Sequence, residues 1–190
     1  AITEDELRTI VEVSHEEGVI ETEEKKMINN VFDFGDTVAK DVMVPRIDMV
    51  MVDVNSTYQE LLDVFREERF TRIPVYEDST DNVIGIINMK DLLLTDESLQ
   101  FSIRDFLREP LYTYEYKKTA ELMMEMRRTF GNMVIVLDEY GATAGLITLE
   151  DMLEDGIFPA GYLDYGRGLL VLTLDGIPEE EPVKQKEAPV

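Results

Sequence analysis

The sequence predicts an α+β fold made of two copies of a β-α-β-β-α unit, and three observations support this prediction. Residues 145–151 (Gly-Leu-Ile-Thr-Leu-Glu-Asp) have the pattern of a buried strand that runs directly into a helix. The related stretch Gly-Ile-Ile-Asn-Met-Lys-Asp stands sixty residues earlier, at 85–91, which indicates an internal repeat. The segments before the two motifs alternate between strand-like and helix-like spacing in the same order. Such units place helices on one face of a small sheet.

The first forty residues predict an acidic helical lead-in. Thr3 and Glu6 have the spacing of a capping box, so a helix is expected to begin there and to end near Gly18. A second helix is predicted over about residues 22–32. Residues 1–40 contain eleven acidic and four basic side chains, which is typical of a solvated helical surface.

The elements of the two units are predicted from short apolar runs separated by turn residues. In the first unit, Pro74 indicates an edge position or a strand start, and Asn88 is the expected N-cap of a short helix. Strands are expected at 49–54, 73–76, 83–87, 111–114, 134–137 and 144–147, helices around 58–65, 89–94 and 122–126, and polar turns at 77–82 and 138–141. Neither unit is long enough to bury a good core alone, so the two units are expected to pack together in a pseudo-two-fold module.

The predicted domain organisation follows from these elements. The lead-in covers residues 1–40, the first repeat 41–97 and the second repeat 98–155. Residues 156–190 contain glycines and prolines followed by a Pro-, Glu- and Lys-rich end, and this tail is expected to be largely disordered.

Composition excludes several classes of function. The net charge of −23 argues against nucleic-acid binding and against adhesion to anionic lipids. The absence of cysteine excludes disulfides and thiolate metal sites, and no apolar run has the length of a membrane span. His15 is the only histidine, and the sequence has no phosphate-binding loop and no dinucleotide fingerprint. We therefore predict no catalytic residues and no metal site, and we expect a protein that is not an enzyme.

Thr148 and Asp151 have the residue types and the spacing that suit a nucleotide. An ionised carboxylate can accept hydrogen bonds from both ribose hydroxyls, and the start of a helix presents free N–H groups to phosphate. The same two residues also have the spacing of an ordinary capping box, so a purely structural role stays open. Asn88 and Asp91 take these places in the first unit. Because asparagine lacks the threonine hydroxyl and methyl, we predict that the second site there is weaker or empty.

Several motifs together resemble a known family. The two units resemble a tandem pair of CBS (cystathionine β-synthase type) domains, or Bateman module, whose ribose-phosphate motif matches residues 145–151. The pieces Asp-Val-Met-Val-Pro-Arg at 41–46, Thr-Arg-Ile-Pro-Val-Tyr at 71–76 and Ile-Val-Leu-Asp-Glu-Tyr-Gly at 135–141 narrow the match. With the acidic lead-in, they are similar to the cytosolic part of the CorC/HlyC (hemolysin C) membrane proteins, which are related to the CNNM magnesium transporters. The resemblance covers about residues 3–155, and residues 155–190 depart from the family pattern.

The resemblance implies a regulatory module that binds an adenine nucleotide, ATP or AMP, with Mg²⁺ carried by the phosphates. It also implies a magnesium or cobalt transport protein whose membrane domain would precede this chain, with the module on the cytoplasmic side. The implied nucleotide site draws on both repeats and contains Val44, Met49, Phe70, Thr71, Arg72, Asn132, Leu146, Thr148 and Asp151. The alternative is a structural dimerisation module with vestigial ligand sites.

A homodimer is expected from the residues as well as from the resemblance. The predicted helices carry wider apolar faces than a small sheet can cover, and such surfaces usually mark an interface. The apolar residues concerned are Leu61, Leu62 and Phe65 in one helix, Leu122, Met123 and Met126 in its counterpart, and the run Leu92, Leu93 and Leu94.

Overall fold

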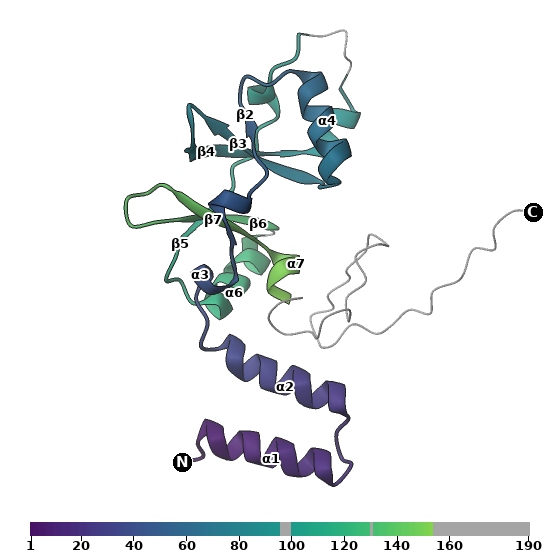
Figure 1. Ribbon diagram of the computed structural model, residues 1–190, viewed down its shortest axis with the longest axis vertical. Helices are drawn as coiled ribbons and strands as arrows, with labels where there is room; N and C mark the ends of the chain where they lie inside the picture. Colours follow the sequence, from purple (N-terminus) through teal and green to yellow (C-terminus); the bar gives the residue numbers. More distant parts are fainter. Residues whose placement is uncertain (96–99, 130, 154–190) are drawn as a thin grey trace, which may run out of the picture.

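The computed structural model describes residues 1–95, 100–129 and 131–153, and it confirms the predicted α+β fold (Figure 1). In chain order the elements are α1 (Glu4–Glu16), α2 (Thr22–Phe34), α3 (Ala39–Val42), β1 (Val44–Pro45), η1 (Arg46–Asp48), β2 (Val52–Asp53), α4 (Tyr58–Glu68), β3 (Arg72–Glu77), β4 (Ser79–Asn88), α5 (Met89–Leu93), η2 (Ile103–Phe106), β5 (Leu111–Tyr114), α6 (Thr119–Thr129), β6 (Met133–Leu137), β7 (Thr143–Thr148) and α7 (Leu149–Met152). The predicted tail at 156–190 lies outside the described residues.

The two repeats have the same strand arrangement. In the three-stranded sheet, β2 pairs parallel with β3, and β3 pairs antiparallel with β4. In the four-stranded sheet, β5 pairs parallel with β6, and β6 pairs antiparallel with β7. The sixty-residue repeat is therefore also a repeat of topology. Figure 1 shows the first sheet with α4 at one end of the molecule and the second sheet with α6 next to it.

The repeats exchange the segments that precede them. The strand β1 belongs by sequence to the first repeat, but it pairs antiparallel with β7 of the second. Ala39, Val42 and Met43 pack in the second core with Leu122 and Ile147. Conversely, a set of residues that precedes β5 packs in or against the first core: Phe101, Ile103, Phe106 and Leu107. The segment before each repeat's first parallel strand thus completes the core of the other repeat. This exchange joins the two units into one module.

The acidic lead-in is a pair of helices that lie side by side beyond the second repeat (Figure 1). The predicted capping box at Thr3 is present, and α1 buries no residue. Charged contacts help to join the two helices: the Arg8 guanidinium bonds Asp33 at 2.8 Å and lies 5.1 Å from the ring centre of Phe32. At its far end the hairpin is anchored, because the Thr37 hydroxyl donates to the Thr119 hydroxyl at 3.0 Å.

Three details of the sequence prediction were wrong. The expected strand at 49–54 contains only the two residues of β2, because η1 turns the chain just before it. The expected polar turn at 77–82 is mostly strand, since β4 begins at Ser79 and the reversal occurs at Asp78 with a φ of 64°. Pro74 lies in the central strand β3, not at an edge or a start. Its missing N–H is tolerated because pairing with β2 begins only at the next residue, Val75.

The apolar surplus is smaller than the sequence suggested. Leu61, Phe65, Leu122 and Met126 are all buried within the chain. Of the apolar residues named for the interface, Leu93 and Leu94 at the end of α5 are exposed, by 71% and 90%, whereas Leu92 is buried. Leu62 and Met123 are partly buried. Among the described residues, no helix combines the length and the apolar character that a membrane crossing needs.

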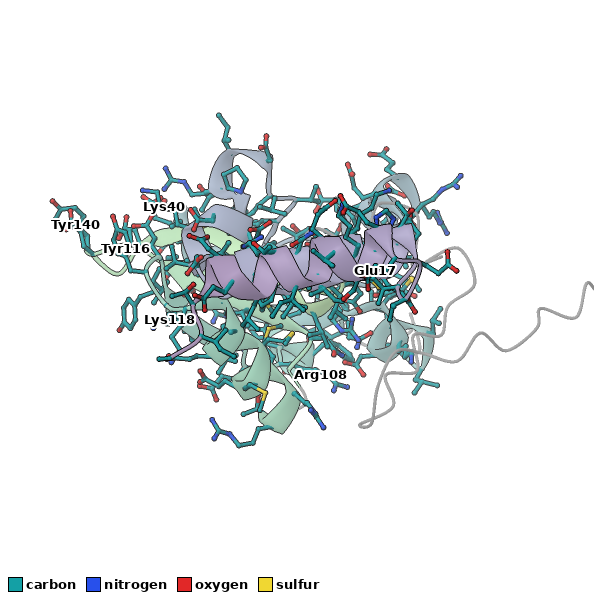
Figure 2. The ribbon with its side chains drawn as sticks, turned by 90° about the horizontal axis from the view of Figure 1, so that it is seen from below. Glu17, Lys40, Arg108, Tyr116, Lys118 and Tyr140 are labelled. Atoms are coloured by element: carbon teal, nitrogen blue, oxygen red, sulfur yellow. The ribbon has the colours of Figure 1, made fainter. Side chains whose placement is uncertain are left out.

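Lys40, Tyr116 and Tyr140 form a small group of basic and aromatic side chains. Figure 2 shows Lys40, Tyr116 and Tyr140 toward the same side of the molecule. The Lys40 ammonium lies 5.9 Å from the ring centre of Tyr116. None of these three side chains lines a cavity described below.

Candidate functional site

Two cavities lie near the repeat motifs, and the larger of these two lies between the repeats, with a volume of about 490 Å³. This size is within the usual range for small-molecule sites. Four stretches form its walls: the segment around β1 and η1, the end of α4 with the start of β3, the start of β6, and the β7–α7 junction. The lining residues are Val44, Asp48, Met49, Val50, Arg69, Phe70, Thr71, Arg72, Pro74, Met133, Leu146, Thr148, Glu150 and Asp151.

The β7–α7 junction provides a helix cap and the carboxylate of Asp151. The Thr148 hydroxyl accepts from the Asp151 backbone N–H at 3.2 Å, so half of the expected capping box is present. In the complete boxes of α1 and α4, Glu6 and Glu60 also accept from the N-cap backbone, at 3.0 and 2.8 Å. Asp151 makes no such bond, and its carboxylate meets no hydrogen-bonding or charged partner among the described residues. The capping role therefore leaves this carboxylate available to a ligand.

One wall of the cavity depends on close backbone packing. Pro45 of β1 faces Gly145 of β7, and Val44 faces Leu146. A Cβ at position 145 would lie 2.5 Å from the Val44 carbonyl oxygen and 2.7 Å from the Met43 sulfur. Only glycine allows this approach, which brings the Val44 side chain to the cavity beside Leu146.

Two arginines give the cavity positive charge inside an acidic protein. Arg72 begins β3, and Arg69 ends α4 in the left-handed conformation with a φ of 58°. That conformation is uncommon for residues other than glycine and asparagine. Arg46 is not available in the same way, because it forms an ion pair with Asp81. The carboxylates of Asp48 and Glu150 also line the cavity, so the charges are mixed.

Eight of the nine residues predicted for the main site line this cavity; Asn132 is the exception. Asn132 precedes β6 and lines a smaller cavity instead. Sequence reasoning missed Asp48, Val50, Arg69, Pro74, Met133 and Glu150. Of these, Met133 could have been found from the strand register, because it pairs with Thr148 across the sheet.

The smaller cavity, of about 200 Å³, belongs to the first repeat's motif. Its lining residues are Arg72, Ile86, Asn88, Arg108, Glu109, Pro110, Leu111, Gly131, Asn132 and Met133. Asn88 caps α5 as predicted, with its Oδ1 accepting from the Lys90 N–H at 3.1 Å. The predicted second-site residue Asp91 does not line this cavity, and its carboxylate is engaged by Arg108. The hydrogen-bonded guanidinium lowers the pKa of the Asp91 carboxyl.

No group of three or more histidine or acidic side chains in the described part of the chain could hold a metal ion. His15 bonds Thr22 through its Nε2 at 3.1 Å, far along the chain from either cavity. The carboxylates near the larger cavity are those of Asp48, Glu150 and Asp151. A partly apolar cavity that also carries charged groups of both signs suits a polar organic ligand.

Comparisons with known proteins agree with this architecture. A family model described as CBS domain matches residues 39–97. The repeat, the fold and the shared cavity define the chain as a tandem CBS domain pair. A solved CBS domain of the bacterial CNNM/CorC family Mg²⁺ transporter is 34% identical, with a TM-score of 0.76, covering 82% of this chain and 96% of that one. A structure of such a domain in complex with ATP is 36% identical, with a TM-score of 0.65, covering 70% of this chain and 95% of that one.

The chain belongs to the CNNM/CorC family. The UPF0053 protein YhdP of Bacillus subtilis is 36% identical over 159 residues, which cover 82% of this chain and 36% of that protein. The chain thus spans about a third of the length of this relative. The family resemblance predicted from the motifs at 41–46, 71–76 and 135–151 is confirmed.

Proposed function

We propose that this chain is a regulatory module that binds one adenine nucleotide, ATP or AMP, in the larger cavity. The observation that carries the proposal is the combination, in one partly apolar cavity, of Arg69 and Arg72 with Asp151, whose carboxylate has no partner among the described residues. A carboxylate at the end of β7 suits the two ribose hydroxyls. The similarity to a CBS domain in complex with ATP supports the same ligand class.

The cavity offers a distinct surface to each part of a nucleotide. Val44, Met49 and Leu146 provide apolar contacts for adenine, and Phe70, which is 49% exposed, stands at the rim. Arg69 and Arg72 would receive phosphate oxygens, since a guanidinium matches phosphate geometry. Magnesium bound to the phosphates would reduce their repulsion from a protein of net charge −23, since Mg²⁺ commonly bridges phosphates and one or two carboxylates. The proposal is one of ligand binding, without catalysis.

Isothermal titration calorimetry with ATP–Mg²⁺ and with AMP tests the proposal. We expect Asp151→Asn to remove binding while thermal unfolding stays cooperative, because the Thr148 cap uses the Asp151 backbone and not its carboxylate. Asp91→Asn is the matched control, since it makes the same change at the equivalent place of the other repeat. If both variants lose nucleotide binding equally, or if Asp151→Asn still binds normally, the assignment of the nucleotide to the Asp151 carboxylate is wrong.

The larger protein is proposed to be a magnesium or cobalt transporter, with this module on the cytoplasmic side of the membrane. Relatives named as Mg²⁺ transporter domains support this proposal. The lead-in gives a route for transmission, because Thr37 and Thr119 tie α2 to the second repeat. Nucleotide-dependent movement of the repeats would then shift α1 and α2.

A homodimer is the second proposal, and the exposed pair Leu93 and Leu94 favours it. Adjacent exposed leucines at the end of a helix are typical of an interface. Light scattering at micromolar concentration is expected to show a dimer, and Leu94→Glu is expected to dissociate it. A strict monomer with and without ATP–Mg²⁺ would remove the dimer. Dimerisation without any nucleotide binding would favour a structural module with vestigial sites.

A further inference from the structure

The repeat allows each residue of the larger site to be compared with its counterpart in the first repeat. Gly145 and Gly85 are equivalent, and each lies against a neighbouring segment. A Cβ at Gly145 would meet the Val44 carbonyl oxygen at 2.5 Å, and one at Gly85 would meet the Leu107 side chain at 2.9 Å and the Arg108 carbonyl oxygen at 3.3 Å. The two neighbouring segments therefore take equivalent places against the two repeat motifs.

The backbone pairing gives the correspondence residue by residue. Val44 pairs antiparallel with Leu146, and Arg108 pairs antiparallel with Ile86. Both backbone bonds of the second pair are 2.9 Å long. Since Leu146 and Ile86 are sixty residues apart and equivalent in the repeat, Arg108 is the counterpart of Val44. An apolar residue beside one site is replaced by a cation beside the other.

This cation binds the carboxylate on which the proposed nucleotide site depends in the other repeat. Arg108 donates from Nε to Asp91 Oδ2 at 2.9 Å and from Nη2 to Oδ1 at 2.8 Å. Asp91 is the counterpart of Asp151, whose carboxylate has no partner among the described residues. A two-pronged arginine engages both carboxylate oxygens at once, which is the interaction that two ribose hydroxyls would otherwise make.

The cavity sizes agree with this difference. The cavity beside the engaged motif measures about 200 Å³, and the one beside the free motif about 490 Å³. The Asn88 side chain still caps α5, so the helix start at the first motif is intact. The Arg108 and Asp91 side chains are 62% and 24% exposed, and an ion pair so open to water adds little to folding stability. The main effect of the Arg108–Asp91 ion pair is therefore expected to be on the access of a ligand to the first repeat's site.

We propose that Arg108 is a specificity-determining residue that closes the first repeat's site to nucleoside phosphates. It does so by occupying Asp91, so that the module takes one adenine nucleotide and not two. The proposal rests on the proposed nucleotide binding at the larger cavity, but its test separates the two.

Calorimetric titration of the full chain with ATP–Mg²⁺ and with AMP tests the role of Arg108. Wild type is expected to bind one equivalent. Arg108→Val, which places the residue type of Val44 at the counterpart position, is expected to bind two. Arg104→Val is the matched control, because Arg104 forms an ion pair with Glu77 and lines neither cavity.

Second-site variants assign each binding event. In the Arg108→Val background, Asp91→Ala is expected to remove the added event, and Asp151→Ala the original one. An unchanged stoichiometry in Arg108→Val, or weaker binding in it, would overturn the proposal, since weaker binding would make Arg108 a ligand of the nucleotide. If thermal unfolding shows that Arg108→Val is not folded, Arg108→Gln is titrated in its place, and the number of bound nucleotides is measured in the same way.

The two proposals fail in different ways. A wild type that binds no nucleotide contradicts the proposed function. An Asp91-dependent event that appears only in Arg108→Val would then still support the role of Arg108. A wild type that binds two equivalents, one of them lost in Asp91→Ala, contradicts the role of Arg108 and leaves the larger site intact.

Discussion

Gly145→Ala should damage both the fold and the nucleotide site, and its counterpart Gly85→Ala should be milder. The Cβ added at 145 would lie 2.5 Å from a backbone carbonyl oxygen, that of Val44, so β1 must move away from β7. At 85 the closest atom, at 2.9 Å, is the flexible end of the Leu107 side chain, and the nearest backbone oxygen is 3.3 Å away. Overpacking of this kind costs about 1–3 kcal/mol, and we expect Gly145→Ala at the upper end of that range.

The structure also predicts where the effect of Gly145→Ala will appear. Displacement of β1 moves Val44, which lines the larger cavity, whereas Gly85 and Leu107 line neither cavity. Urea unfolding followed by circular dichroism should rank stability as wild type, then Gly85→Ala, then Gly145→Ala. Calorimetry should show weaker ATP binding only in Gly145→Ala. A Gly145→Ala protein that is as stable as Gly85→Ala and binds ATP normally would show that the close approach of β1 to Gly145 matters neither for stability nor for the site.

Three further predictions follow from single contacts. Thr148→Asn should keep its stability, because Asn88 caps the equivalent helix, but should bind nucleotide about tenfold more weakly through loss of the hydroxyl; unchanged affinity in calorimetry would contradict this. Tyr112→Phe removes the 3.0 Å bond that joins β5 to Val83 of β4, and should cost about 0.5–1.5 kcal/mol in urea unfolding. Arg108 lowers the pKa of Asp91, so the small stabilisation that this exposed pair provides is present above about pH 4 and is lost as pH falls through the folded-state pKa of Asp91. The stability difference between wild type and Arg108→Val should therefore shrink at lower pH in thermal unfolding, and a difference that persists at pH 2 would argue against this assignment.

Local patterns predicted the repeat and most of the elements. The motifs ending at Asp91 and Asp151 each follow a strand and begin a helix, as their spacing indicated. The capping box at Thr3 was predicted correctly because its hydrogen bonds join residues only three positions apart. Eight of the nine residues that the family resemblance implied lie together in one cavity. Of these, Thr148 and Asp151 were also indicated by their own residue types and spacing.

Long-range pairing was beyond the reach of these patterns. Nothing local to Val44 shows that β1 joins the sheet of the second repeat, or that Leu107 packs in the core of the first. The same limit applies to Arg108, whose partner Asp91 is seventeen residues away in the sequence. Arg69 was missed because its left-handed conformation depends on how α4 ends.

A crystal structure of this chain with ATP–Mg²⁺ or AMP would show directly where the nucleotide binds. We expect one nucleotide per chain in the larger cavity, with both ribose hydroxyls within hydrogen-bonding distance of the Asp151 carboxylate. We also expect adenine against Val44 and phosphate oxygens near Arg69 and Arg72, while Arg108 stays paired with Asp91. A nucleotide bound at the Asp91 motif, or a ribose that does not contact Asp151, would show that the proposed site is wrong.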